Sequence, residues 1–243
     1  MKYSVIIPIF NEEESLLPLY YSLKEVMNKL SKQYEILFVD DGSTDSSLER
    51  LRRVYVNSKG LSIIVLKERV GKAEALQAGF DNATGEIYIT LDGDGQDDPR
   101  EIPSLLDKMD EGLDVVYGWR RRRHDPFTKK IASRTANMIR RLITKEKIHD
   151  VGCAMRVFRK KDIEHVCLSK GLHRFFSAIM VKLGYKVGEV EVVHHPRETG
   201  ISKYGIWDRL GEGIIDIIRF SFLDIHTLMS HERKYQIKKI LRR

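Results

Sequence analysis

The sequence predicts an α/β fold with a mostly parallel central sheet flanked by helices. Short runs rich in Val, Ile and Leu alternate with stretches of helical length, and the apolar runs end in Asp, Gly or Lys residues. This βα rhythm is typical of a parallel sheet, whose ligands lie beyond the carboxyl ends of its strands. At 243 residues, 42% of them hydrophobic, the chain is long enough for one such domain with a small extension.

Three apolar runs predict the first strands of the sheet, in the order Lys2–Glu12, Tyr34–Val39 and Leu61–Leu66. The first run breaks at Pro8. The second runs directly into the acidic segment Asp40–Asp45, and the third leads through Gly71 and Lys72 to a predicted helix over Ala73–Phe80. Because the carboxyl ends of parallel strands meet at one edge of a sheet, we expect these polar segments to lie together.

A fourth predicted strand, Ile87–Leu91, leads into the most informative residues of the chain. Asp92 and Asp94 come after it, and each is followed directly by a glycine. Two carboxylates so close together can converge on one hard divalent cation, and the glycines let the backbone turn tightly. A cation held by so few carboxylates keeps positions that phosphate oxygens usually fill. The alternative is a polar turn without a ligand, but three strand ends of this kind favour a ligand site.

Five motifs occur in an order that resembles the family 2 glycosyltransferases with the GT-A fold. They are Pro8–Glu12, Asp40–Ser43, Asp92–Gln96, Asp150–Arg156 and Arg197–Tyr204. The last two make the chain similar to the dolichyl- and undecaprenyl-phosphate sugar transferases rather than to cellulose or chitin synthases. The resemblance covers about residues 3 to 225, and we expect a GT-A type catalytic domain over residues 1–205.

The resemblance implies an inverting, metal-dependent hexosyltransferase of the polyprenyl-phosphate sugar synthase type. The donor would be a nucleotide sugar, either GDP-mannose or a UDP-sugar, and the acceptor a dolichyl or undecaprenyl phosphate. A Mg²⁺ or Mn²⁺ ion would neutralise the charge that builds on the leaving nucleoside diphosphate. The motifs leave open which nucleotide, which sugar and which lipid are used.

The resemblance also implies roles for individual residues. The metal would be held by Asp92, Asp94 and Gln96, and the nucleotide sugar would be bound by Pro8, Phe10, Glu12, Asp40, Lys72, Asp92, Arg197 and Lys203. The acceptor phosphate would be bound by Arg120, Arg134 and Ser202, and the residues assigned to catalysis are Asp94, Asp150 and Arg197.

Some of these residues carry an alternative or depart from the family pattern. Lys72 could equally be a surface lysine. Asp150 is either a base, as in relatives with hydroxyl acceptors, or a group that orients the site. A phosphate monoester, with its second pKa about 6, is largely dianionic near neutral pH and needs no base, which favours the orienting role. Gly93 and Gly95 replace commoner residues in the metal motif, and Phe10 stands where relatives often have Tyr.

Basic charge is concentrated in one segment, Trp119–Lys147. It holds eleven Lys and Arg residues, Arg120–Arg123 among them, against two acidic residues, whereas the whole chain has a net charge of +7. Arg matches phosphate oxygens bidentately, so an anionic membrane surface bearing a lipid phosphate is the favoured partner. A solvated helix face is the plainer alternative. No nucleic acid partner is expected, because interleaved aromatics are few and no binding motif is present.

A second membrane signal lies near the C-terminus. Over Ile206–Met229 the charged residues recur at helical spacing as one narrow polar stripe, and the apolar arc around it is wider than a helix needs for packing on its own domain. The residues from His231 onward are basic, which is common beside a segment at a membrane interface. We therefore expect residues 206–243 to form an amphipathic helical extension. Burial against the catalytic domain, a homo-oligomer contact or a separate membrane partner are the alternatives.

Other features bear on the cellular setting. The chain has no run of 18 uncharged apolar residues and enters a strand at its first residues, so neither a transmembrane helix nor a signal peptide is expected. Cys153 and Cys167 are too few for a disulfide framework, which favours a reduced compartment. The sequence thus predicts a cytoplasmic protein attached peripherally to the cytoplasmic face of a membrane.

Three other functions remain as alternatives at this point. A glycosyltransferase with a soluble glycan or protein acceptor would keep Asp92 and Asp94 but would not need the basic segment. A nucleotidyltransferase normally carries a Gly-rich loop near its first strand, and Pro8–Glu12 is not one. A non-catalytic module that binds nucleic acid or an anionic membrane would use the arginines and not the metal motif.

Overall fold

The computed structural model describes residues 1–121, 148–164, 166–168, 175–195 and 235–242. The strands of these ranges form one eight-stranded sheet in the order β7-β5-β6-β4-β1-β2-β3-β8. Their bounds are β1 Tyr3–Ile9, β2 Tyr34–Asp40, β3 Leu61–Leu66, β4 Ile87–Thr90, β5 Val115–Trp119, β6 Arg156–Arg159, β7 Val187–Glu191 and β8 Ile237–Arg242. The helices are α1 Leu16–Leu30, α2 Ser47–Tyr55, α3 Lys72–Asn82, a 3-10 turn at Pro99–Glu101, α4 Ile102–Asp110, α6 Lys160–Ile163 and α7 Phe176–Lys182.

The sheet has a parallel part and a mixed part. Strands β4, β1, β2 and β3 are parallel neighbours, as the sequence predicts. Strand β6 runs antiparallel to β4 and to β5, and β7 is parallel to β5. The four predicted strands and the helix after β3 are confirmed, and the fold class with them.

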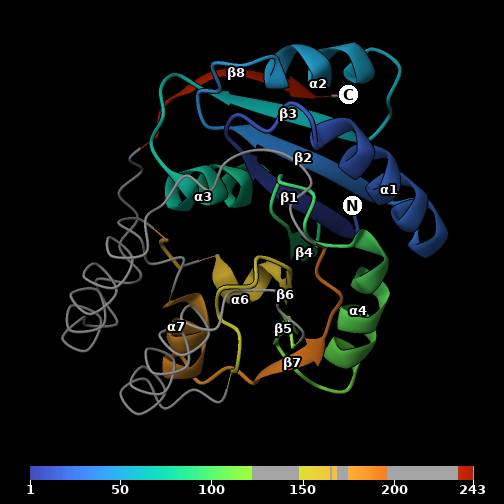
Figure 1. The fold of residues 1–243 in the computed structure, drawn as a ribbon. Coiled ribbons are helices and arrows are strands. Elements are labelled where there is room, and N and C mark those ends of the chain that lie inside the picture. Colours follow the sequence, from blue (N-terminus) through green and yellow to red (C-terminus); the bar gives the residue numbers. More distant parts are fainter. Residues whose placement is uncertain (122–147, 165, 169–174, 196–234, 243) are drawn as a thin grey trace, which may run out of the picture.

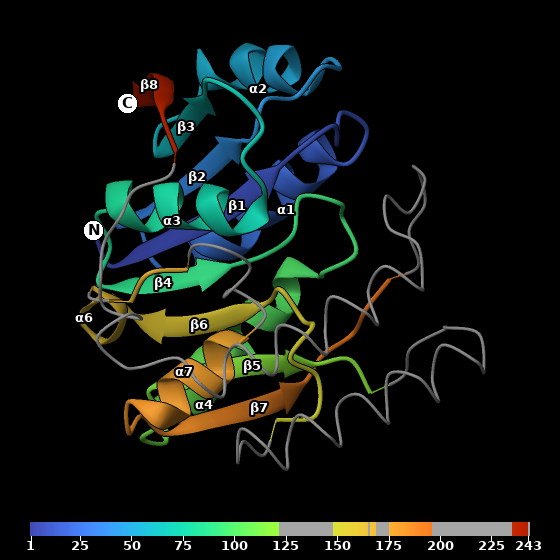
Figure 2. The ribbon, with the colours of Figure 1, turned by 90° about the vertical axis from the view of Figure 1, so that its left-hand side faces the viewer.

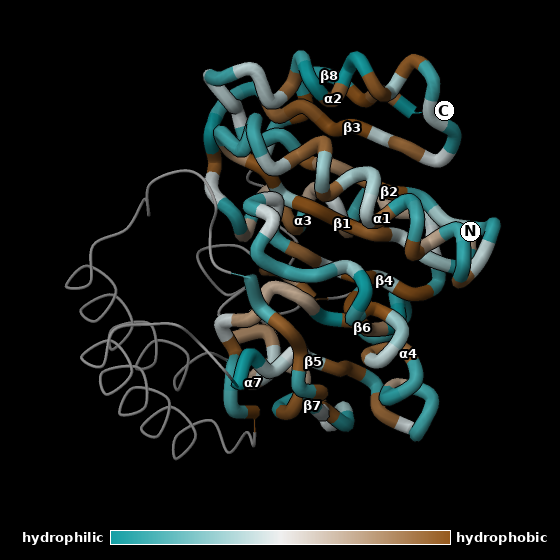
Figure 3. The backbone as a smooth tube through the Cα atoms, turned by 45° about the vertical axis from the view of Figure 1, so that its right-hand side comes forward, coloured by the Kyte–Doolittle hydropathy of each residue, from teal (hydrophilic) through white to brown (hydrophobic). Residues whose placement is uncertain are grey.

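Helices cover both faces of the sheet. Figures 1 and 2 show α1 and α4 on one side of the strands, with α3 and α7 on the other. Side chains of β1 alternate between these layers: Val5 and Ile7 belong to the core under α1 and α4, and Ile6 belongs to the core under α3 and α7. In Figure 3 the strands at the centre of the sheet are accordingly hydrophobic along much of their length. Continuous apolar strands are what a sheet buried on both faces requires.

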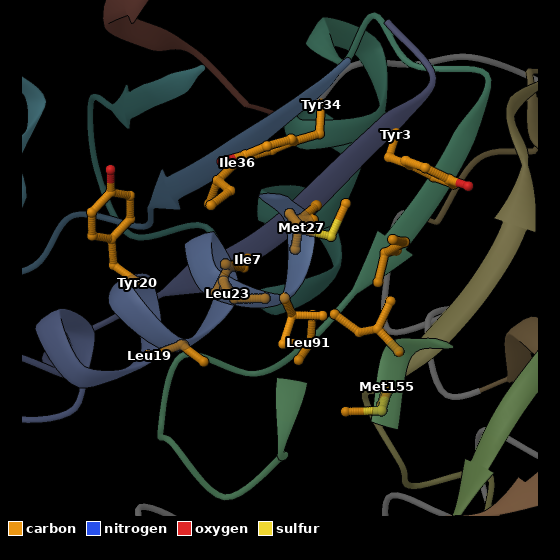
Figure 4. Close-up of a cluster of buried hydrophobic side chains, with 14 of the residues drawn as sticks. Tyr3, Ile7, Leu19, Tyr20, Leu23, Met27, Tyr34, Ile36, Leu91 and Met155 are labelled. Carbon is orange, nitrogen blue, oxygen red and sulfur yellow. The ribbon is translucent and has the colours of Figure 1, made fainter. Parts of the chain in front are cut away.

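Helix α1 shows how one face of the core is built. Leu19, Leu23 and Met27 recur on one side of the helix and are at most 4% exposed. Figure 4 shows them packed toward Ile7 of β1 and Leu91 after β4. Burying one such leucine stabilises the fold by about 1.5–3 kcal/mol. The carboxyl end of β4 thus rests on a rigid hydrophobic layer.

Pro8 does not interrupt β1, although the sequence suggested a break there. The carbonyl of Ile6 accepts a hydrogen bond from the N–H of Leu91, so Ile6 faces the β4 side of the strand. Pro8, two residues later, faces the same side, and the pairing between β1 and β4 has ended at Ile6 and Thr90. The missing N–H of Pro8 therefore costs the sheet no hydrogen bond.

The C-terminal extension differs from its prediction. Residues 237–242 were expected to be part of a helical extension, and this was wrong, because they form β8, an edge strand antiparallel to β3. The apolar residues of β8 pair with apolar residues of β3: Ile237 with Leu66, Ile240 with Ile64 and Leu241 with Ile63. Its lysines protect an exposed sheet edge against further pairing. Most of the basic segment (122–147) and the apolar arc at 206–229 lie outside the described residues.

In the part of the chain that the structure describes, no helix combines the length and the hydropathy needed to cross a bilayer.

Candidate functional site at the carboxyl edge of the sheet

The loops after β1 and β2 are joined by hydrogen bonds at the carboxyl edge. The N–H of Asn11 donates to Ser43 Oγ at 3.1 Å, and the N–H of Glu12 donates to Ser47 Oγ at 2.9 Å. Asn11 adopts a left-handed backbone with φ 54°, which Asn tolerates better than most residues. The segments predicted to meet at this edge therefore do so.

Asp40 is the last residue of β2 and Asp41 follows it, and both side chains are buried. Asp40 accepts a hydrogen bond from the N–H of Ser43, and burial raises its pKa although Ser43 acts in the opposite direction. The carboxylate of Asp41 accepts from the N–H of Val70 at 2.7 Å and from that of Gly71 at 2.9 Å. Burial also raises the pKa of Asp41 against these two bonds. Asp41, which the sequence reasoning did not single out, thus positions the loop that leads into α3.

Phe10 has a charged partner that the sequence did not predict. The guanidinium carbon of Arg69 lies 4.0 Å from the centre of the Phe10 ring, the geometry of a cation–π contact. The two residues belong to the loops after β1 and β3, near Asp40. No local signal links them, because 59 positions of sequence separate them. The pair forms a surface made of an aromatic ring and a guanidinium, in the loops that follow β1 and β3.

Lys72 and Asp92 form an ion pair between the start of α3 and the end of β4. Burial raises the pKa of Asp92, but the ammonium of Lys72, followed by Arg120 and Arg156, more than offsets this and leaves the pKa below its usual value. Asp92 is therefore ionised at neutral pH. Its negative carboxylate already stabilises the positive charge of the Lys72 ammonium beside it.

The loop after Asp92 is shaped by its two glycines. A Cβ on Gly93 would lie 2.7 Å from Ile9 Cγ2, so a side chain there would have to displace the buried Ile9. Gly95 has φ 73°, a left-handed backbone that glycine adopts more readily than residues with a side chain. The carbonyl of Gly93 accepts from Ser15 Oγ at 2.6 Å, and Asp94 Oδ1 accepts from the N–H of Gln96 at 3.2 Å. Both departures from the family pattern thus have a local steric or conformational reason.

The oxygen atoms of this loop fit a hard divalent cation. Asp92 and Asp94 supply carboxylates, and the amide nitrogen of Gln96 donates to the carbonyl of His195 at 3.3 Å, which leaves its amide oxygen as a donor for a metal. Among the described residues no group of three or more His, Cys, Asp or Glu side chains forms a metal cluster. Two carboxylates and one amide leave coordination positions for ligand oxygens.

Arg120 and Asp150 form a buried, bidentate ion pair on the other side of the site. Arg120 Nε lies 2.6 Å from Asp150 Oδ2, and its second nitrogen, Nη2, lies 2.9 Å from Oδ1. The backbone N–H of Arg120 also donates a hydrogen bond to the Asp150 carboxylate. Desolvation would lower the pKa of Arg120, but the Asp150 carboxylate outweighs it and raises that pKa above its usual value. The fork of Arg120 is therefore held in one orientation.

A second buried arginine, Arg156, links the two sides. Its Nε donates to the carbonyl of Cys153 at 3.1 Å, and its guanidinium lies 4.8 Å from the Tyr117 ring centre. A small cavity of about 10 Å³ lies between Arg156 and the Lys72–Asp92 pair and is also lined by Leu76, Thr90, Leu91 and Ala154. It has room for about one water molecule.

The structure thus brings together many of the predicted site residues. Those on or near the carboxyl edge are Pro8, Phe10, Glu12, Asp40, Lys72, Asp92, Asp94, Gln96, Arg120 and Asp150. Arg134, Arg197, Ser202 and Lys203 lie outside the described residues.

Solved structures with a similar fold are glycosyltransferases. Glucosyl-3-phosphoglycerate synthase from Mycobacterium tuberculosis, in complex with Mn²⁺, uridine-diphosphate-glucose and phosphoglyceric acid, superimposes with a TM-score of 0.66 at 16% identity, over 89% of this chain and 79% of that chain. A structure of the same enzyme with Mg²⁺ and uridine-diphosphate has a TM-score of 0.66 at 17% identity, with the same coverage. These likenesses define the class of fold, which is the GT-A type.

The family follows from the sequence comparison. Residues 4–167 match the model of glycosyl transferase family 2, and the chain belongs to that family. It is 40% identical over 228 residues to the dodecaprenyl-phosphate galacturonate synthase of Rhizobium johnstonii, covering 91% of this chain and 67% of the relative. It is 37% identical over 202 residues to the undecaprenyl-phosphate 4-deoxy-4-formamido-L-arabinose transferase of Pectobacterium atrosepticum, covering 83% of this chain and 62% of the relative. The chain therefore spans about two thirds of the length of these relatives.

Proposed function

We propose that this chain transfers a sugar, with inversion, from a nucleotide sugar to a polyprenyl phosphate. The observation that carries the proposal is the convergence of a metal-compatible loop, Asp92–Gln96, with two buried arginines at one edge of the sheet. Two relatives at 37–40% identity carry polyprenyl-phosphate sugar transfer in their names, which supports the same acceptor class. GDP-mannose and UDP-sugars are the candidate donors.

The donor half of the site comprises the loops after β1, β2, β3 and β4. We assign the nucleotide base to the surface formed by Phe10 and Arg69, with the carboxylate of Asp40 as an acceptor for a base N–H. Pro8 and Glu12 shape the wall of this pocket from the end of β1. Lys72 is the first residue of α3. Its ammonium group and the N-terminus of the helix would both attract the negative charge of a diphosphate.

A divalent cation, Mg²⁺ or Mn²⁺, would be held by Asp92, Asp94 and Gln96. When bound, it supplies Lewis-acid neutralisation of the charge that develops on the leaving diphosphate. Asp92 contributes an ionised carboxylate beside Lys72, so diphosphate charge would be met by the ammonium and by the cation together. Solved structures with this fold contain Mn²⁺ with uridine-diphosphate-glucose or Mg²⁺ with uridine-diphosphate, which supports this choice of metals.

The acceptor half comprises Arg120, Asp150 and Arg156, and we assign the lipid phosphate to it. A phosphate oxygen forms the new bond to the anomeric carbon as the bond to the nucleoside diphosphate breaks. Because a phosphate dianion needs no base, Asp150 serves to orient Arg120, in keeping with their bidentate pair. On sequence alone, Arg134 and Ser202 would complete the phosphate site, and Arg197 and Lys203 would contact the donor and the reacting phosphates.

The acceptor also implies a place of action. We propose that the chain works peripherally at the cytoplasmic face of a membrane, with the basic segment Trp119–Lys147 and the apolar arc of 206–229 as the contacts. Binding to anionic vesicles should weaken with salt without vanishing, and should fall when Ile214, Ile218 and Phe222 are made polar. Co-sedimentation with anionic and neutral vesicles over a salt series checks this. Equal binding to anionic and neutral vesicles would indicate that the apolar arc of 206–229 contacts another copy of the chain or the protein core instead of a membrane.

The enzymatic proposal is tested by a transfer assay with a panel of sugar nucleotides. Each is offered with undecaprenyl phosphate in detergent or with a soluble glycan, with and without a metal chelator. We expect product only with the polyprenyl phosphate, and loss of product on chelation that Mg²⁺ or Mn²⁺ restores. Arg134→Ala should raise the acceptor concentration needed, with little change in donor binding. Transfer to the soluble glycan alone would overturn the acceptor assignment.

A further inference from the structure

Two aspartates directly follow the metal loop and are nearly buried. Asp97 is 5% exposed and Asp98 is 7% exposed. Neither was assigned a role by the motifs. A buried carboxylate is costly unless it is paired or hydrogen-bonded. Their partners lie on the segment after β7, about 100 positions further along the chain.

The carboxylate of Asp97 contacts both the start of the metal loop and the segment after β7. Its Oδ2 accepts a hydrogen bond from the N–H of Asp92 at 3.4 Å, which closes the loop from its first residue to its end. Its Oδ1 lies 3.7 Å from Nδ1 of His194, a ring nitrogen that is buried and has no hydrogen-bond partner in the described part of the chain. The backbones of Asp97 and His194 also form an antiparallel β-bridge. One carboxylate thus contacts a metal-ligand residue and a second segment.

The neighbouring residues repeat this connection. The N–H of His195 donates to the carbonyl of Gln96 at 2.9 Å, while the side-chain amide of Gln96 donates back to the carbonyl of His195. Asp98 contacts His195 Nε2 at 3.2 Å but also receives the guanidinium of Arg100 at 2.7 Å. Asp98 therefore has a strong second partner on its own turn. Asp97 instead contacts Asp92 and His194, and its negative charge also acts on Arg120 of the acceptor half.

We propose that Asp97, together with His194, is a positioning residue that holds the Asp92–Gln96 loop in its metal-binding geometry. This inference rests on the proposed function. The physical reason is that a metal site with few protein ligands gains affinity when those ligands are fixed before the ion arrives. Groups that orient metal ligands without touching the metal typically contribute about 10- to 100-fold to affinity.

The test is binding of Mn²⁺ in the presence of UDP or GDP, followed by calorimetry and by the electron paramagnetic resonance spectrum of Mn²⁺. For Asp97→Asn we expect Mn²⁺ affinity to fall about 10- to 100-fold, with the apparent KM for metal rising by more than the acceptor KM. Asp162→Asn is the matched control, since Asp162 is a buried aspartate on α6 outside the site. It should leave Mn²⁺ binding unchanged.

A second variant covers the case in which Asp97→Asn does not fold. His194→Leu keeps the bond from Asp97 to Asp92 and removes the other partner, and we expect affinity to fall about 5- to 10-fold. Wild-type protein that binds no Mn²⁺ with either nucleotide would overturn the proposed function. Wild-type binding with unchanged affinity in Asp97→Asn, or in His194→Leu where Asp97→Asn does not fold, would overturn the positioning role alone.

Discussion

The donor half and the acceptor half of the site differ in how deeply their ion pairs are buried. In the donor half, the side chains of Lys72 and Asp92 are 38% and 34% exposed. In the acceptor half, those of Arg120 and Asp150 are 11% and 8% exposed. The first pair lies at the carboxyl ends of parallel strands, and the second lies in the mixed part of the sheet beside β6.

Because of this difference, we expect variants of the donor-half pair to affect activity alone, and variants of the acceptor-half pair to affect both activity and stability. A partly exposed ion pair contributes about 1 kcal/mol or less to folding, because water screens it. Removing one partner of a buried pair costs about 3–5 kcal/mol, because the remaining charge stays desolvated. Donor-half variants should therefore lose activity and keep their fold. Acceptor-half variants should lose both.

The largest effect on activity is expected for Asp94→Ala. Loss of a metal ligand removes several kcal/mol of stabilisation from the leaving diphosphate, so turnover should fall by about a hundredfold or more. The melting temperature should stay near that of the wild type, because the Asp94 side chain is half-exposed. Turnover at saturating Mg²⁺ or Mn²⁺ measures this, with Asp107→Ala on the exposed side of α4 as the control. Near-wild-type turnover would remove Asp94 from the metal site.

Arg120→Ala is expected to break the acceptor half. It leaves the Asp150 carboxylate buried without its bidentate partner, so the free energy of unfolding should fall by about 3–5 kcal/mol together with transfer. The double variant Arg120→Ala/Asp150→Ala should recover part of the stability and none of the transfer. Urea denaturation and the transfer assay separate the two effects. A fully stable single variant would show that this pair behaves like the exposed one in the donor half.

Phe10→Ala should have a smaller effect, confined to the donor. Removal of the ring abolishes the contact with Arg69, worth about 0.5–2 kcal/mol, so nucleotide affinity should fall by about 2- to 30-fold. Phe10→Tyr keeps an aromatic face and should bind nearly as the wild type does. Calorimetric titration with UDP and GDP provides the measurement. If both variants bind equally well, the nucleotide base lies elsewhere.

The smallest effect is expected for Asp162→Asn, which lies outside both halves. Burial raises the pKa of Asp162 in the folded protein above its value in the unfolded chain, so the folded state binds the proton more tightly. Ionisation then costs stability as the pH rises above about 4. Asparagine removes this cost, so the variant should be more stable at pH 7, and the gain should disappear below about pH 4. Thermal melts across this range check the sign.

Most of the donor half was predictable from the sequence. Each strand from β1 to β4 is a local apolar run, and each polar residue that matters follows its strand directly. Asp40, Lys72 and Asp92 could be found because parallel strands bring their carboxyl ends to one edge whatever the details of packing. The two carboxylates of the metal motif were found from their spacing, and Gln96 was added from the family resemblance. Only the structure explains the two glycines of this motif: a Cβ on Gly93 would lie too close to Ile9, and Gly95 has a left-handed backbone.

The sequence by itself determined the alternating strands and helices, the parallel sheet and the residues at its strand ends, because these depend on local periodicity. Tertiary structure decided the pairings across long separations: Arg69 on Phe10, Arg120 on Asp150, and Asp97 between Asp92 and His194. It also placed residues 237–242 as a strand beside β3. Such contacts depend on which strands become neighbours, and that is set by how two layers of helices cover both faces of one sheet.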